Sequence, residues 1–330
     1  FLFGNVINTT TIEQLHFSGL VTGDVFDLPA GTVGLVLGGE YRENRIESRN
    51  VIVRAQGLSA SEAPDQEGDT IGEVYIWELY AETEIPLHDM FLVNLSGRYT
   101  EEENFGEEFT YSVKADFTPL DWVRLRGTYG TTFRAPNLRE QFLSGQAGVI
   151  AGGNDPCIVP TTANNSGTYD PAGETRTQRV LDNCVADNVD PTALGLQANV
   201  LIPTQTGGAQ GDLQAETSES FTLGAVISQP FTDAFNFDFA VTYYDIEIED
   251  TVEELNPATV LARCYSEEPN LASPLCDRIQ RRGVNPGNNT VSLVDASFVN
   301  VGLQTATGID FNGRFTDDFT AMGRNFDILL

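Results

Sequence analysis

Four cysteines are the residues of this 330-residue sequence whose chemistry is most readily interpreted. Neither the spacing from Cys157 to Cys184 nor that from Cys264 to Cys276 fits the C-x-x-C pattern of zinc and redox sites. Both stretches are rich in Pro, Asn and Gly, so we expect disulfides that staple the surface loops of an exported protein. Free structural thiols are the alternative. Four cysteines permit three pairings, and we expect the local one, Cys157 with Cys184 and Cys264 with Cys276.

Residue types that carry catalysis are sparse and scattered. The two histidines, His16 and His88, stand far apart, so no trio of zinc ligands is available. The sequence has no G-x-S-x-G, P-loop or dinucleotide-binding motif. The acidic run Glu101–Glu103 is typical of a solvated loop. We therefore expect no enzyme, no catalytic or cofactor-binding residues and no metal site.

Calcium is the one ion for which ligands could be named. Aspartates in the long loops could offer oxygen ligands, although they lack the spacing of an EF-hand. They are Asp155, Asp170, Asp182, Asp187 and Asp190.

The formal net charge is −30, from 48 acidic and 18 basic residues. This charge excludes nucleic acid as a partner, because phosphate neutralisation requires Lys and Arg. The carboxylates lie between or at the ends of stretches that alternate apolar and polar residues. They therefore belong on loops or in a wet lumen, while an acidic soluble domain is the simpler alternative.

The elements that would position these residues are β-strands, because polar and apolar residues alternate with period two. In the strand expected at 121–134, Val123 and Leu125 fall on one face and Arg124 and Arg126 on the other. The phase slips near Tyr244, where we expect a bulge or emergence from the membrane. Ten strands are expected, at 12–27, 32–48, 71–86, 90–102, 107–118, 121–134, 217–230, 234–250, 294–315 and from 324 onward.

Strand length and loop length indicate a membrane barrel. Most expected strands exceed the roughly 9–11 residues of a tilted membrane strand, whereas no apolar run approaches the roughly 18 residues of a membrane helix. Short turns, among them 230–234 and 316–324, alternate with long connections at about 49–70, 135–216 and 251–293. Short periplasmic turns and long extracellular loops are typical of outer-membrane barrels. The fold class we expect is an all-β, antiparallel, up-and-down transmembrane β-barrel.

A barrel in lipid turns its apolar face outward and allows polar residues inside. We expect ion pairs with a plug, or with inward carboxylates such as Asp116 and Glu78, to be the main role of the inner basic residues. Contact with a substrate is the second role we consider, although the outer loops are the better candidates for it. The lumen-facing candidates are Arg98, Lys114, Arg124, Arg126 and Arg134.

Ten strands would leave two bare edges in lipid, where unpaired backbone groups cost several kcal/mol each. The sequence starts at Phe1 without a signal peptide and stops within a strand pattern. We therefore expect residues 1–330 to be one partial barrel domain of a longer protein.

Several stretches resemble the C-terminal half of TonB-dependent outer-membrane receptors. The segment Phe133-Arg134-Ala135-Pro136 looks like the strand end that precedes a large external loop in that family. Leu213-Gln214-Ala215-Glu216 is similar to the family's re-entry into the barrel, although Ala215 replaces the usual Pro. Further similar segments are Tyr243-Tyr244-Asp245-Ile246, Asn300-Val301-Gly302, Gly308-Ile309-Asp310 and, for a disulfide-closed outer loop of one branch, Cys264 to Cys276.

The resemblance implies a 22-stranded barrel closed by a plug domain and energised through a TonB box. The plug and the box are absent from this sequence. The implied function is active uptake of a scarce nutrient, such as a siderophore, cobalamin, an oligosaccharide or a peptide, across the bacterial outer membrane. The implied partners are outer-membrane lipid, the protein's own plug and TonB, with the long loops extracellular.

Three alternatives remain. A passive porin-like channel would need no plug, and the Phe-Arg-Ala-Pro and Gly-Ile-Asp segments speak against it. A secreted or surface β-rich binding protein would be soluble without detergent. An outer-membrane enzyme lacks a nucleophile or a metal set.

Overall fold

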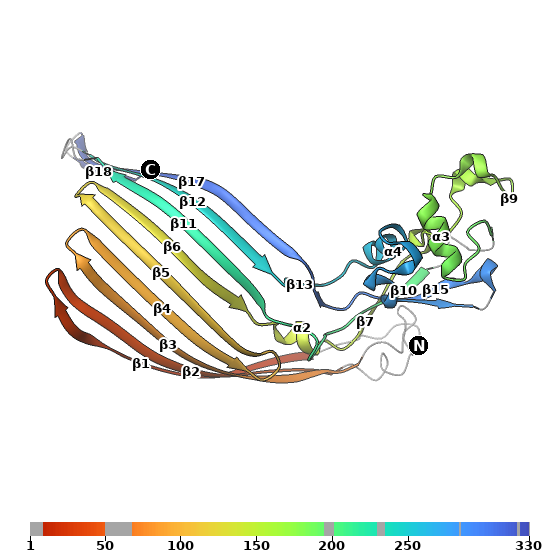
Figure 1. Cartoon of the computed structure of the whole chain (residues 1–330), viewed down its shortest axis with the longest axis horizontal. Helices are drawn as coiled ribbons and strands as arrows, with labels where there is room; N and C mark the ends of the chain where they lie inside the picture. Colours follow the sequence, from red (N-terminus) through yellow and green to blue (C-terminus); the bar gives the residue numbers. More distant parts are fainter. Residues whose placement is uncertain are drawn as a thin grey trace.

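The computed structural model describes residues 9–49, 68–194, 201–229, 235–283, 285–321 and 324–329, with side chains described up to residue 317. These residues form a long curved sheet and a smaller folded unit beyond one end of its strands (Figure 1). No helix within these ranges is long and apolar enough to cross a membrane.

The large sheet is an antiparallel meander in which neighbours in the sequence pair with one another. Across the described ranges it has ten strands in the order β1-β2-β3-β4-β5-β6-β11-β12-β17-β18, and β1 and β18 stand at its two ends. Their bounds are β1 (Thr9–Leu28), β2 (Gly31–Arg49), β3 (Thr70–His88), β4 (Phe91–Glu102), β5 (Gly106–Leu120), β6 (Val123–Arg134), β11 (Glu216–Ser228), β12 (Asn236–Glu249), β17 (Leu303–Ala321) and β18 (Arg324–Leu329).

The second part, called the loop unit below, consists of the described residues of 135–215 and 250–302. It contains a four-stranded sheet in the order β14-β15-β10-β7 and two-stranded pairs β13-β16 and β8-β9. Its bounds are α2 (Leu138–Phe142), β7 (Gln146–Ala151), β8 (Asn164–Asn165), β9 (Thr168–Tyr169), α3 (Gln178–Ala186), β10 (Leu201–Thr206), β13 (Val252–Glu253), α4 (Pro257–Ser266), β14 (Ile279–Arg282), β15 (Thr290–Asp295) and β16 (Val299–Asn300), with 3-10 helices at Gly152–Asn154, Thr161–Ala163, Pro171–Gly173, Pro269–Leu271, Pro274–Arg278 and Pro286–Asn288.

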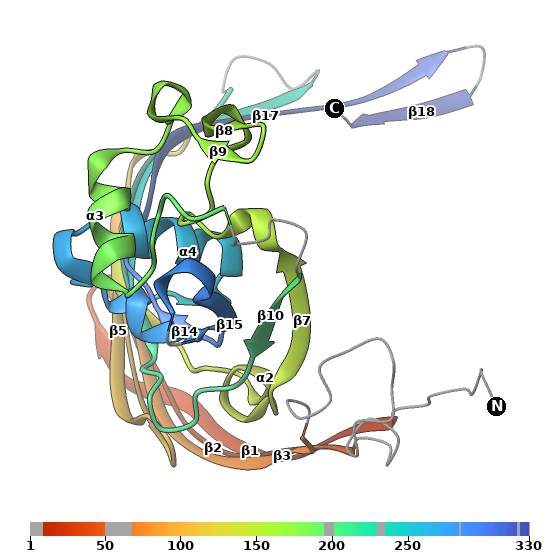
Figure 2. The same cartoon turned by 90° about the vertical axis from the view of Figure 1, so that its right-hand side faces the viewer.

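The two faces of the large sheet differ as the alternating pattern predicts. One face is largely apolar and uncovered by the rest of the chain: Leu79, Phe109 and Phe311 are 66%, 63% and 68% exposed. Charged residues of this face, such as Arg45 and Glu247, lie near the loop-unit ends of the strands. The other face carries the charged residues and lines the hollow of the sheet, in which α2 lies (Figure 2). The sheet is therefore a curved wall with a polar inside and an apolar outside.

Buried apolar residues are concentrated in the loop unit. One cluster contains Cys157, Cys184, Cys264 and Tyr265, each at most 1% exposed. A second cluster joins Ile202 of β10 and Val294 of β15 to α4. The long connections of the sheet are thus a packed structure with a core of their own.

Most of the expected strands are confirmed to within about two residues at each end. A short turn at 103–105 joins β4 to β5, whereas the expected turn at 230–234 lies outside the described residues. The expected turn at 316–324 is wrong, because β17 continues to Ala321 and pairs with β18 from Arg324.

Two further expectations were wrong. The strand expected at 294–315 starts only at Leu303, because residues up to Asp295 belong to β15 in the small sheet and Gly302 breaks the extended backbone with φ +67°. The third long connection therefore runs to residue 302. The bulge expected near Tyr244 is absent, since β12 pairs in continuous register with both β11 and β17. The residue pattern changes because Ile246 and Ile248 lie on the inner face, whereas Asp245 and Glu247 lie on the outer face near the loop-unit end of the strand. The other interpretation, emergence from the membrane, stays a prediction.

Candidate functional site

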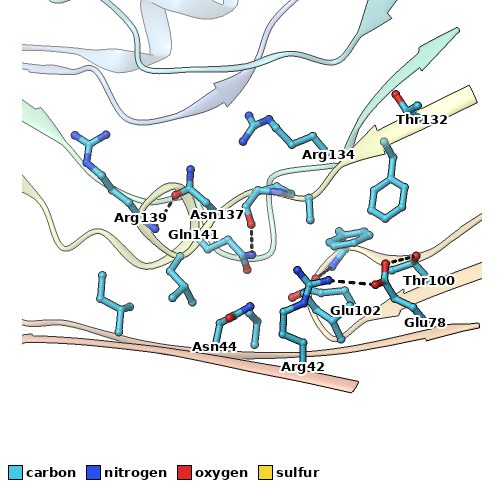
Figure 3. Close-up of a pocket in the computed structure, with 18 of the residues that line it drawn as sticks. Arg42, Asn44, Glu78, Thr100, Glu102, Thr132, Arg134, Asn137, Arg139 and Gln141 are labelled. Atoms are coloured by element: carbon cyan, nitrogen blue, oxygen red, sulfur yellow. Dashed lines mark hydrogen bonds and ion pairs between the residues drawn. The ribbon is translucent and has the colours of Figure 1, made fainter. Parts of the chain in front are cut away.

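A pocket of about 790 Å³ lies where the inner face of β2 to β6 meets α2 (Figure 3). Its apolar lining includes Ile46, Val74 and Phe105, and its polar lining includes Arg42 and Gln141. Pockets of this size accommodate small molecules. The family-like segment from Phe133 to Pro136 also lines it, so this segment joins the wall to the pocket.

Arg134 is the hub at the end of β6. Its guanidinium donates to Glu216 of β11 at 2.7 and 2.5 Å and to Glu140 of α2 at 2.9 Å. Glu216 also accepts from the backbone N–H of Val252 at 2.7 Å. Paired arginine–carboxylate forks are strong and directional. One side chain therefore ties the wall to both long connections.

The chain turns into α2 directly after this hub because Asn137 and Glu140 form a capping box. The Asn137 side chain accepts from the N–H of Glu140 at 3.0 Å, and the Glu140 carboxylate accepts from the N–H of Asn137 at 2.7 Å. The pattern Asn-x-x-Glu after Pro136 is a sequence signal for a helix start. This helix was not expected from the sequence, although its start signal was readable.

Glu78 organises the wall side of the pocket and is only 5% exposed. Arg42 of β2 and Arg98 of β4 each donate to it at 3.1 Å, and the Thr100 hydroxyl donates at 3.0 Å (Figure 3). Arg98 also lies 5.0 Å above the Tyr80 ring. A buried carboxylate with two guanidinium partners is satisfied electrostatically, so this cluster shapes the wall.

The five basic residues expected to face a lumen lie on the face of the sheet that α2 covers. Arg98 and Arg134 line the pocket, whereas Lys114, Arg124 and Arg126 lie farther along the wall. Arg124 pairs with Asp116 at 2.6 Å, and Arg126 donates to Thr242 at 3.1 Å. Register places Lys114 opposite Thr128. The ion pairs with Glu78 and Asp116 are those that the sequence suggested.

The other family-like residues lie at the junction of β12 and β17. The Asn300 side chain accepts from the N–H of Gln214 at 2.8 Å and donates to the carbonyls of Gln214 and Asp250. Gly308 lies against the Tyr244 ring with no room for a Cβ. Asp310 pairs in register with Thr242 on the inner face. Asn300 and Gly302 therefore shape the return of the chain into the wall.

Both disulfides have the expected pairing. Cys157 is bonded to Cys184 and Cys264 to Cys276, and no free cysteine occurs in the described residues. Both lie in the same buried cluster of the loop unit. The sequence could place them in loops but could not reveal that the two loops share one core.

Arg281 is a second hub, and no sequence pattern predicted it. It is 5% exposed and forms a fork with Asp155 at 2.8 Å. It also donates to Asp187 at 2.7 Å and to the Tyr265 hydroxyl at 2.9 Å. Burial alone would lower the pKa of Arg281, but the hydrogen bonds and charge of Asp155 raise it above its ordinary value. Burial raises the pKa of Tyr265.

The aspartates considered for calcium have other partners. Asp155 and Asp187 bind Arg281, Asp170 and Asp190 cap turns, and Asp182 accepts from Gln178. Among the residues that the structure describes, no group of three or more His, Cys, Asp or Glu could hold a metal ion. The calcium hypothesis finds no support there.

The chain is similar in sequence or in fold to several known proteins. The iron-regulated outer membrane virulence protein of Vibrio cholerae serotype O1 is 27% identical over 180 residues, which are 51% of this chain and 27% of that protein. A mutant of the ferric enterobactin receptor PfeA of Pseudomonas aeruginosa, in complex with enterobactin, matches with a TM-score of 0.55 at 16% identity. The match covers 97% of this chain and 36% of that chain.

The hemophore receptor HasR of Serratia marcescens, in complex with its hemophore HasA and heme, also matches with a TM-score of 0.55 at 11% identity. That match covers 98% of this chain and 43% of the receptor. At such identities the likeness shows the fold alone, and the chain spans less than half the length of these relatives.

The family described as TonB dependent receptor-like, beta-barrel, matches residues 2–328. Proteins of this family are outer-membrane transporters rather than enzymes. The long antiparallel sheet, its polar inner face and the match over nearly the whole length agree, and this chain belongs to the β-barrel part of the TonB-dependent receptors.

Proposed function

We propose that the chain forms part of the barrel wall and outer loops of a receptor that takes up a scarce nutrient with energy from the TonB system. The observation that carries the proposal is the family match over residues 2–328. The cargo we favour is an iron-carrying small molecule, such as a ferric siderophore or heme. The names of the relatives, a ferric enterobactin receptor and a hemophore receptor, support this preference.

The polar inner face would then line the conduit and meet a plug domain supplied by another part of the receptor. The exposed apolar outer face, with Leu79, Phe109 and Phe311, would contact membrane lipid. The loop unit would lie on the extracellular side, because long loops face outward in such barrels. Arg98, Arg124 and Arg134 would act through their ion pairs with wall carboxylates, which set the shape of the conduit.

The test uses the full-length receptor in a strain that lacks its gene. Uptake of radioactive iron, supplied as a panel of ferric siderophores and as heme, should depend on the complementing gene. Removal of TonB should reduce that uptake to the level of the deletion strain. Gene-dependent uptake that persists without TonB would instead identify a passive channel.

A further inference from the structure

The pairing between β5 and β6 ends before these strands reach the loop unit. β5 stays paired with β4 up to its first residue, and β6 stays paired with β11 up to its last residue. The ladder between β5 and β6, in contrast, ends at the pair Ser112 and Gly130. Residues 106–111 of β5 and 131–134 of β6 therefore have a ladder partner on one side only. The opening between these two stretches is called the slot below.

Side chains lie across both ends of the slot. At the end nearer the middle of the wall, the N–H of Tyr111 donates to the Thr131 hydroxyl at 3.1 Å. At the end nearer the loop unit, the ring centroids of Phe105 and Phe133 lie 5.9 Å apart. Alternate residues of a strand point their N–H groups toward the same neighbour, so the N–H of Phe109 also points into the slot. An open strand edge of this kind is a template for pairing with another chain.

Pockets flank the slot on both faces of the wall. A pocket of about 310 Å³ on the outer face is lined by Phe109 and Thr131. The inner pocket of about 790 Å³ reaches Thr110 and Thr132, and Figure 3 shows Thr132 at its edge. An added strand would turn alternate side chains to opposite faces of the wall. Both sets of its side chains would therefore find a pocket.

The outer pocket carries negative charge without a balancing cation. Its lining includes the carboxylates of Glu219 on β11 and of Glu247 and Glu249 on β12. Glu219 lies directly opposite Glu247 in the ladder, and like charges in this arrangement destabilise a sheet. Glu219 accepts a hydrogen bond from the Tyr129 hydroxyl at 3.1 Å, but none of the three carboxylates has an ion-pair partner among the described residues. Lys or Arg side chains in this pocket would relieve the repulsion.

The inner pocket contains a buried acceptor without a donor. Gln141 of α2 is 4% exposed, and its side-chain nitrogen donates to the Pro136 carbonyl at 2.7 Å. Its side-chain oxygen has no hydrogen-bond partner within the described part of the chain. The same pocket holds Arg98 and Arg134, which already bind carboxylates. A hydroxyl or amide would satisfy Gln141, whereas a further cation would be repelled by these arginines.

We propose that the slot is a docking site for an extended segment of a partner polypeptide, which adds as a strand to the free edge of β5. Its side chains are basic where they face the outer pocket and uncharged hydrogen-bond donors where they face the inner one. In strand addition, main-chain hydrogen bonds provide affinity and the pockets for alternate side chains provide specificity. This docking function goes beyond the proposed uptake and does not depend on the nutrient.

The binding test uses the purified full-length receptor in detergent and a fluorescent peptide of alternating lysine and threonine. The comparison peptide has the same composition, with the lysines and threonines in two blocks. The alternating peptide should bind more tightly by about tenfold or more, because only its lysines share one face of a strand. Equal binding of the two peptides would reduce the attraction to charge alone and overturn strand addition.

N-methylation tests the main-chain pairing separately. Methylating alternate amides of the alternating peptide removes the donors along one edge of the strand and keeps every charge. In the more damaging of the two possible registers, binding should weaken by about tenfold or more, because the hydrogen bonds to β5 are lost. Unchanged binding in both registers would contradict pairing with the wall.

Charge variants test the outer pocket. Glu219→Gln with Glu247→Gln keeps the side-chain size and relieves a pair of like charges, so the receptor should fold. Binding of the alternating peptide should weaken by about tenfold or more, since close charge pairs across an interface are lost. The matched control is Glu13→Gln with Glu43→Gln, which neutralises carboxylates on β1 and β2. Equal losses in the two double variants would overturn the assignment to the slot.

Cross-linking locates the bound peptide in the unaltered receptor. A carbodiimide joins a lysine of the peptide to a nearby carboxylate through an amide bond, with loss of water, and peptide mass mapping identifies the carboxylate. Coupling should be concentrated at Glu219, Glu247 and Glu249. Coupling spread over the acidic loops would overturn the site.

Intact cells distinguish a docking segment from cargo. The alternating peptide should stay at the cell surface whether or not TonB is present. Import into the periplasm that depends on TonB would make the peptide a cargo and overturn the docking role. Binding to the purified receptor requires no TonB, so failure of the uptake proposal would leave the docking result interpretable.

Discussion

Arg134 stands where the wall of the sheet meets the loop unit, and its two carboxylate partners come from α2 of the loop unit and from β11 of the wall. Replacing it by Ala would leave Glu140 and Glu216, 11% and 14% exposed, without their cation. Hydrogen bonds between charged groups contribute about 1.5–3 kcal/mol each to stability. We expect Arg134→Ala to reduce exchange protection at the amides of Gln141, Leu143 and Val252 by about tenfold or more.

Arg124→Ala is the matched control for this change. Arg124 is also an arginine of β6, but its side chain is 55% exposed and pairs with one carboxylate, Asp116. Exposed ion pairs contribute about 0–1 kcal/mol. Equal loss of protection around α2 in both variants would show that Arg134 does not hold this junction.

Arg281 allows a sharper prediction, because its guanidinium is buried among Asp155, Asp187 and Tyr265. Arg281→Met keeps much of the volume but removes the charge, so the local free energy of unfolding should fall by about 3–5 kcal/mol. Arg263→Met serves as the control, since Arg263 is 56% exposed. The measurement is the rate at which chymotrypsin cleaves the loop unit. Trypsin is avoided because it cuts at arginine, the residue that both variants remove. Similar cleavage rates in both variants would show that Arg281 does not stabilise the loop unit.

Glu174 predicts a pH dependence. The hydrogen bonds and charge of Arg176 hold the pKa of Glu174 at about 2, well below its usual 4.5, against a smaller opposing effect of burial. A lowered pKa stabilises the fold fully above the unfolded-state pKa, and this stability disappears as the pH falls through about 2. The contribution at neutral pH is at most about 3 kcal/mol by this linkage.

The check compares the parent receptor with Glu174→Gln during pepsin digestion between pH 5 and pH 2. The parent should resist cleavage better at pH 5, and the two rates should converge as the pH falls. A ratio of rates that stays constant with pH would exclude Glu174 as the titrating group.

At the scale of elements, the disulfides should act on the loop unit and leave the sheet intact. In the chain-entropy description, closing the longer Cys157–Cys184 loop contributes about 3–4 kcal/mol and the shorter Cys264–Cys276 loop about 3 kcal/mol. Replacing both cysteines of one pair by Ser should therefore destabilise the loop unit, somewhat more for Cys157 and Cys184 than for the other pair. Hydrogen exchange in the loop unit, followed across a urea titration, measures the stability of that part. The heat-dependent change in gel migration shows whether the sheet stays folded. Loss of the sheet together with the loops would contradict this independence.

The strands were predictable from sequence because one face of the wall is apolar and the other polar, so period two is visible. The start of α2 was also readable from Asn137 and Glu140, although it lies inside a long connection. The start of β17 was not predictable, because residues 290–295 have strand propensity but pair within the small sheet. Propensity alone does not say which sheet accepts a strand.

At the scale of the whole molecule, the sequence predicted the inner position of the five basic residues through alternation alone. It could not predict that Arg98 and Arg42 share Glu78, because this depends on the register of three strands. The junction of Arg281 with Asp155 likewise joins residues 126 positions apart. Contacts at such separation follow from the packing of the loops and leave no local pattern.

The central claim is that these 330 residues, of 36.0 kDa, are one part of a plugged outer-membrane receptor. The measurement that tests it most directly is peptide mass mapping of the polypeptide in detergent-extracted outer membrane, with its size read from a denaturing gel. The account predicts a parent protein far larger than 36.0 kDa, with plug peptides preceding Phe1. A product of 36.0 kDa that is soluble without detergent would contradict it and favour a secreted β-rich binding protein.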